Sequence, residues 1–112
     1  AIGVTLDAVE MTEHRVLADL ASGRNPGPAS SMLKTQGTET MQKLDELVVE
    51  GIAAYAAVDQ KAARAPDAGQ DFVGPEHGLT GMARYLNNRA GSIYGGSNEI
   101  QRDIMARLVL GL

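Results

Sequence analysis

The chain has 112 residues, 44% of them hydrophobic and only 4% aromatic, and its formal net charge at pH 7 is −4. This length predicts one domain with a small aliphatic core, and the acidic charge argues against nucleic acid because no basic stripe is present. There is no cysteine, and His14 and His77 lie far apart, so neither a disulfide nor a metal site is expected. No apolar run approaches the roughly twenty residues of a membrane span. We expect a cytoplasmic protein, and the start without methionine indicates a fragment or a processed product.

The first expected helix covers residues 5–22. Its apolar residues recur at steps of three and four, which is the helical period. They are Leu6, Val9, Val16, Leu17 and Leu20. Gly23 and the run Asn25-Pro26-Gly27-Pro28 predict a stop and a turn.

The second expected helix runs from residue 28 or 29 to residue 58. Its predicted buried stripe consists of Leu33, Met41, Leu44, Leu47, Val48, Ile52 and Tyr55. Gly37 and Gly51 predict either close packing or a kink. Two helices joined by a short Gly-Pro turn predict an antiparallel hairpin.

Residues 59–78 interrupt the helical pattern and predict a loop of about twenty residues, long for a compact domain. This loop is interpreted either as a mobile surface excursion or as a flap anchored by Phe72 and Val73. A third helix is expected over residues 79–93, with Leu79, Met82 and Leu86 among its core residues.

Arg84 and Arg89 lie toward the carboxyl end of this third helix. Cations there favour the helix dipole, which is the first explanation for both. The alternative is that Arg89 contributes charge to an anion bound near the following glycine turn.

The last twenty residues join the turn Tyr94-Gly95-Gly96-Ser97 to an amphipathic helix. Ser97 is a good N-cap, and Glu99 places a negative charge in the first turn, where the helix dipole favours it. The apolar stripe of this helix is expected to comprise Ile100, Ile104, Met105 and Leu108. A glycine pair before a capped helix is either a simple tight turn or a place where backbone N–H groups hold phosphate.

The fold class that follows is all-α, an antiparallel bundle of about four helices forming a single domain over residues 1–112. Such a bundle has a marginal core by itself, so we expect it to pack against other protein.

The residues from Tyr94 to Arg102, reading YGGSNEIQR, resemble the C-terminal signature of the acyl-CoA dehydrogenase family. The segment Pro26-Gly27-Pro28 with Ser31, Leu33-Lys34 and Gly37, and the run Asn88-Arg89-Ala90, are also similar to this family's C-terminal helical domain. The resemblance covers nearly the whole chain and is poorest in residues 59–78. It implies that the N-terminal helical domain and the β domain of the family are absent.

The resemblance implies an FAD-dependent α,β-dehydrogenation of an acyl-CoA thioester, as in β-oxidation and lipid metabolism, with electrons passing to an electron-transfer flavoprotein. It implies assembly into a homo- or hetero-oligomer, a dimer or tetramer. Gly96, Ser97 and Glu99 are the implied cofactor contacts, with Ser97 near the phosphates or ribitol and Glu99 near the adenosine end. Tyr94 and Gly95 are the implied substrate-proximal residues.

Two departures from the family pattern matter. Many members carry the catalytic glutamate directly after the aromatic residue, where this chain has Gly95, so no catalytic base is expected at this position. The base then comes from an earlier helix, or this is the base-less subunit of a heteromeric dehydrogenase, as in some bacterial branches acting on steroid side-chain thioesters. The glycine-rich FAD loop after the second helix is replaced by Ile52-Ala53-Ala54-Tyr55, so its contacts are not transferred. A different hypothesis is a non-catalytic helical oligomerisation module.

Overall fold

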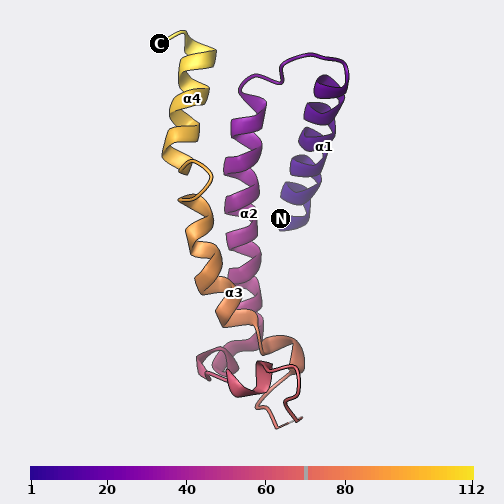
Figure 1. Ribbon diagram of the computed structural model, residues 1–112, viewed down its shortest axis with the longest axis vertical. Helices are drawn as coiled ribbons and strands as arrows, with labels where there is room; N and C mark the ends of the chain where they lie inside the picture. Colours follow the sequence, from indigo (N-terminus) through magenta and orange to yellow (C-terminus); the bar gives the residue numbers. More distant parts are fainter. Residues whose placement is uncertain (70) are drawn as a thin grey trace. The chain divides into compact units, whose positions relative to one another are not determined.

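The protein is described by a computed structural model that covers residues 1–69 and 71–112 (Figure 1). Its α-helices are α1 (Ile2–Ala21), α2 (Ala29–Ile52), α3 (Gly81–Asn88) and α4 (Asn98–Leu110). Short 3₁₀ helices are η1 (Ala53–Ala57), η2 (Ala62–Arg64), η3 (Glu76–Gly78) and η4 (Arg89–Ser92). No strand occurs in these ranges, and the expected all-α fold of about four helices is confirmed.

The chain forms two compact units. The first comprises Ala1–Met41 and Gly91–Leu112, and the second comprises Gln42–Ala90. Helix α2 contributes residues to both units. The expectation of a single domain over residues 1–112 stays a prediction.

The first unit begins with a helical hairpin, as expected. Gly23, with φ 72°, follows the end of α1, and the Asn25 side-chain oxygen accepts a hydrogen bond of 2.9 Å from the backbone N–H of Gly27. In Figure 1, α1 and the start of α2 lie side by side and run in opposite directions. The Gly-Pro turn predicted from the sequence therefore reverses the chain, because each of its bends is stabilised locally.

The buried face of α2 differs from the predicted one. Positions spaced alternately by four and three residues form a polar seam, made of Ser31, Thr35, Thr38, Gln42 and Asp45, all buried or half-buried. In the predicted stripe Ile52 is buried, but Met41, Leu47 and Tyr55 are about half exposed.

The polar seam can be buried because its hydroxyl groups bond to the helix itself. Thr35 donates to the Ser31 carbonyl at 3.0 Å and Thr38 donates to the Lys34 carbonyl at 2.7 Å. These short side chains satisfy their own polar groups and leave room for a neighbouring backbone. The apolar stripe predicted for α2 was therefore wrong in part, since Ile52 is buried as predicted but other members are about half exposed.

The stripes predicted for α1 and α4 are also mostly exposed. On α1, Val16 is buried, whereas Leu17 and Leu20 are each 54% exposed. On α4, Ile100 is 55% and Leu108 is 60% exposed. Periodicity identified the helices correctly, but it does not show which faces are covered within this chain.

In the second unit, α2 ends at Ile52 rather than continuing to Val58. Ala53 has φ 47°, a left-handed backbone conformation, which interrupts the α-helical hydrogen bonds. Ile52 is 3% exposed and packs where glycine leaves space, since a Cβ on Gly81 would lie 2.9 Å from Ile52 Cδ1. Helix α3 is likewise shorter than the predicted 79–93, because its last turn continues as the 3₁₀ helix η4.

The segment predicted as a loop, residues 59–78, is irregular apart from η2 and η3; Gln70 lies outside the described residues. The proposed side-chain anchor is incomplete, because Phe72 is half-buried but Val73 is 55% exposed. The backbone of Val73 is held instead by Gln60, whose amide oxygen accepts from Val73 N at 2.6 Å and whose amide nitrogen donates to Val73 O at 2.9 Å. His77 is exposed, as is His14 on α1.

A polar network joins α2 to α3 inside the second unit. The Asp45 carboxylate is 1% exposed, accepts a hydrogen bond of 2.7 Å from Asn88 Nδ2 and lies 3.5 Å from the Arg84 guanidinium. Gln42 Nε2 donates to the Asn88 carbonyl at 3.1 Å. This network satisfies a carboxylate that would otherwise be costly to bury.

Arg89 also belongs to the second unit. It bonds to the Glu46 carboxylate and to the Gln42 carbonyl, both at 3.2 Å, and its guanidinium lies 4.4 Å from the centre of the Tyr85 ring. These contacts give Arg89 a structural role. Its assignment to a bound anion stays a prediction.

Candidate functional site

The turn before α4 is open to solvent. Gly95 and Gly96 have φ of 66° and 82°, a region that favours glycine, and both are exposed, as is Tyr94 at 62%. A Cβ on Gly95 would meet no atom within 4 Å, whereas one on Gly96 would lie 2.6 Å from Gln101 Nε2. The bend is therefore accessible, and its backbone conformation favours glycine at both positions.

Ser97 caps α4 as predicted. Its φ and ψ of −61° and 156° are extended, and its hydroxyl oxygen accepts a hydrogen bond of 3.4 Å from the backbone N–H of Ile100. The serine thus satisfies one of the amide groups that lack an intrahelical partner in the first turn.

Glu99 lies in the first turn of α4, also as predicted, and is fully exposed. Its own backbone N–H, followed by the Ser97 hydroxyl, holds the pKa of the Glu99 carboxyl below its ordinary value. Smaller contributions in the same direction come from the charges of Arg102 and Lys34. The carboxylate therefore acts as a local anion at the positive end of the helix.

Lys34 and Asn98 are the site residues whose contacts the sequence did not predict. The Lys34 ammonium donates to the Gly91 carbonyl at 3.1 Å and to Asn98 Oδ1 at 2.8 Å. Asn98 is 3% exposed and Gly91 is buried. The sequence feature that could have indicated these contacts is the position of Lys34 among small hydroxyl residues at the start of α2.

A second link joins α2 to α4 in the same unit, where Arg102 pairs with Glu39. Both partners are more exposed than the Lys34–Asn98 contact, so salt and water screen this pair.

The geometry of this site is that of a positively charged helix end beside an open bend, and its use for anion binding stays a prediction. Gly96, Ser97 and Glu99 lie together at the bend, and the amino end of α4 and Lys34 supply positive charge. Gly95 has no side chain to accept a proton, so this position supplies no base. The cofactor and substrate roles of these residues, and of Tyr94, stay predictions.

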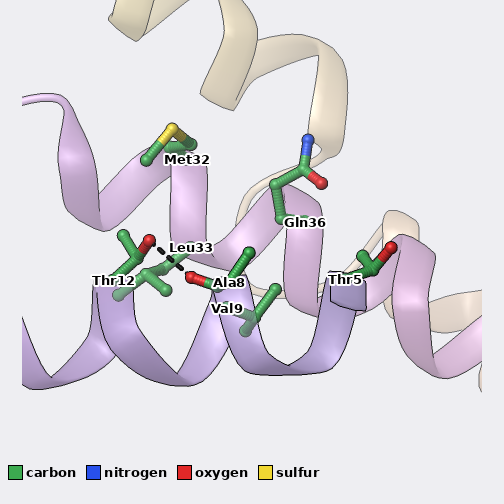
Figure 2. A pocket seen from close by; sticks show the side chains of 7 residues that line it. All are labelled: Thr5, Ala8, Val9, Thr12, Met32, Leu33 and Gln36. Carbon is green, nitrogen blue, oxygen red and sulfur yellow. Dashed lines mark hydrogen bonds between the residues drawn. The ribbon is translucent and has the colours of Figure 1, made fainter. Parts of the chain in front are cut away.

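A separate groove of about 220 Å³ lies between α1 and α2 of the first unit (Figure 2). Its lining consists of Thr5, Ala8, Val9, Thr12, Met32, Leu33 and Gln36. Thr12 donates to the Ala8 carbonyl at 2.7 Å, which satisfies its hydroxyl within α1. These lining residues carry no charged group, so they offer no acid or base for catalysis.

Residues 1–69 and 71–112 lack two other kinds of site. No helix there is long and apolar enough to cross a membrane. The same residues contain no group of three or more acidic or histidine side chains placed to hold a metal ion.

The comparisons with known proteins agree with the sequence resemblance. A family model described as "Acyl-CoA dehydrogenase, C-terminal domain" matches residues 2–110. Two proteins named acyl-CoA dehydrogenase IpdE1, from Mycolicibacterium smegmatis and Mycobacterium tuberculosis, are each 71% identical to this chain over 28 residues. That match covers 25% of this chain and only 7% of each relative's length. No solved structure matches. Since the family match spans nearly every residue, the chain belongs to the acyl-CoA dehydrogenase family, whose C-terminal domain it contains.

Proposed function

We propose that this chain is part of an FAD-dependent acyl-CoA dehydrogenase, in which the bend at residues 94–97 and the amino end of α4 contribute to FAD binding. The observation that carries the proposal is the open bend, where two exposed glycines with positive φ lead into a capped helix end. Family membership supports the class of reaction, because the family generally uses FAD.

The residues present fit a nucleotide diphosphate. Space is open at Gly95, so a ligand can approach the backbone, and the Lys34 charge adds to the positive end of α4. Ser97 would contact the phosphates or the ribitol. Glu99 would serve the adenosine end as a hydrogen-bond acceptor, since its carboxylate repels phosphate and must rotate away from the helix end.

When bound, FAD would supply the acceptor for the hydride from Cβ of the acyl-CoA. The protein's residues would orient the thioester, and a base on this protein or on a partner subunit would take the α proton. Tyr94 and Gly95 would line the substrate side of the bend. Electrons would then pass to an electron-transfer flavoprotein.

The test uses the full-length protein that carries this chain. We expect it to retain FAD after desalting, with visible absorption, and Ser97→Ala to bind FAD several-fold more weakly because the proposed contact of the Ser97 hydroxyl, a hydrogen bond worth about 1 kcal/mol, is lost. Ser30→Ala is the matched control, since Ser30 is an exposed serine of α2. A colourless wild-type protein that takes up no added FAD would refute the proposal.

The position of the base divides the proposal into two cases. A self-sufficient enzyme has its base on another part of its own chain, whereas a base-less subunit depends on a partner. Gly95→Glu places a carboxylate in open space, and Gly95→Gln is its uncharged match. If the full-length protein alone is inactive and only the glutamate variant gains exchange of the acyl-CoA α proton with D₂O, the base-less subunit is favoured.

A second function, helical assembly, is supported by a different observation. Leu17 and Leu20 on α1 and Ile100 and Leu108 on α4 are each more than half exposed. Large apolar side chains in such numbers favour contact with other protein, which fits a homo- or hetero-oligomer. Sedimentation of the full-length protein as a stable monomer would contradict an assembly role for these faces.

A further inference from the structure

Lys34 contacts the segment around the bend at both of its ends. Its ammonium bonds to the carbonyl of Gly91, three residues before Tyr94, and to Oδ1 of Asn98, directly after Ser97. A side chain of α2 thus brackets the whole bend with two hydrogen bonds. One glycine permits this approach, since a Cβ on Gly91 would lie 3.2 Å from Thr38 Cγ2 of the same helix.

The partners of Lys34 are neutral oxygens. Among the described residues no carboxylate lies within 4.0 Å of its ammonium, although the side chain is part-buried. Hydrogen bonds in which one partner is charged are stronger than neutral ones, so these two contacts can hold a bend that glycines leave free to change conformation. The Lys34 charge also adds to the positive end of α4, where it helps to lower the pKa of the Glu99 carboxyl.

We infer that Lys34 is a positioning residue for the flavin nucleotide: by bonding Gly91 and Asn98 it holds the bend at residues 94–97 open and presents the amino end of α4. This inference rests on the proposed function, in which that bend binds FAD. Lys34 acts through the backbone, and no contact between Lys34 and the nucleotide is required. If Lys34 only links α2 to α4, removing any other link between these helices should weaken FAD binding by the same factor.

The Glu39–Arg102 pair provides the matched control, because it also links α2 to α4 but lies outside the bracketed segment. The experiment compares Lys34→Met with Glu39→Gln in the full-length protein. Three quantities are measured: the FAD dissociation constant by flavin fluorescence, backbone hydrogen exchange of residues 91–98 without FAD, and the urea midpoint. Hydrogen exchange reports the bend directly and does not depend on activity.

We expect Lys34→Met to raise the FAD dissociation constant by about tenfold or more, since it removes two hydrogen bonds that a charged group donates. The same variant should speed backbone hydrogen exchange in residues 91–98. Glu39→Gln should change both by less than about twofold, as an exposed pair contributes little. If Lys34→Met does not fold, Asn98→Ser replaces it, with faster exchange in the same segment as the expected result.

Each contrary outcome has its own meaning. Wild-type protein that binds no FAD refutes the proposed function itself. If the wild type binds FAD and Lys34→Met binds it equally well, or leaves exchange in residues 91–98 unchanged, the positioning role of Lys34 is wrong while the proposed function stands. Equal losses in Lys34→Met and Glu39→Gln also overturn the positioning role, because a general link between the helices would then explain both.

Discussion

Replacing Gly95 by alanine, glutamine or glutamate tests whether the bend is as open as its geometry indicates. At φ 66° any residue with a Cβ adopts a left-handed conformation, which costs about 1–2 kcal/mol. The lower entropy of the unfolded chain offsets about 0.4–1 kcal/mol of this cost. A Cβ at Gly95 meets nothing within 4 Å, so there is no steric cost to add. We therefore expect each of the three variants to lose about 1 kcal/mol of folding free energy.

The assay is urea unfolding of the full-length protein without FAD. With m values of about 1–3 kcal/mol/M, a loss of 1 kcal/mol lowers the urea midpoint by about 0.3–1 M, and the three variants should agree with one another. Gly96→Ala is the matched control, because its Cβ would lie 2.6 Å from Gln101 Nε2 and its backbone would also be strained by a positive φ. It should cost more than Gly95→Ala, and Gln101→Ala should remove the difference. A glutamate or glutamine variant that costs over about 1 kcal/mol more than alanine would refute the reasoning, because the longer side chain would then meet a closed surface.

Three further predictions concern charge, burial and strain. Because the pKa of Glu99 is lowered in the folded protein, the ionised Glu99 carboxylate stabilises the fold above the ordinary pKa of 4.5, and this stabilisation is lost as the pH falls through the lower folded value. Glu99→Gln should remove this part of the acid dependence of the urea midpoint. Carboxyl NMR should show Glu99 titrating below 4.5. Asp45→Leu should cost about 1–3 kcal/mol because it leaves the Asn88 amide unpaired, and adding Asn88→Leu should recover part of that loss, whereas strict additivity would show that the pair is not coupled. Ala53→Gly relieves a left-handed φ of 47° and should raise the urea midpoint by an amount worth up to about 1 kcal/mol; a lower midpoint would show that the methyl group outweighs the strain.

Local features of the sequence predicted the geometry of the bend. The N-cap at Ser97, the acidic first turn at Glu99 and the glycine bend at residues 95–96 depend only on neighbouring residues, and all three are present in the structure. The roles of these residues toward FAD stay predictions, since they come from the family resemblance and not from a contact in this chain.

The lengths of the helices depended on backbone conformation that propensity does not reveal. Ala53 is a good helix former, yet its positive φ ends α2 six residues before the predicted end at Val58.

By itself, the sequence determined the all-α class, the helices, the hairpin turn and the capped bend, because each follows from a short pattern of residues acting on the adjacent backbone. The tertiary structure alone decided which faces are buried. It buried the polar seam of α2 and left Leu17, Ile100 and Leu108 exposed, since hydroxyl groups bonded to their own helix permit close packing as apolar side chains do. The link from Lys34 to Gly91 and Asn98 likewise joins residues 57 and 64 positions apart, and only folding brings such distant groups within hydrogen-bonding distance.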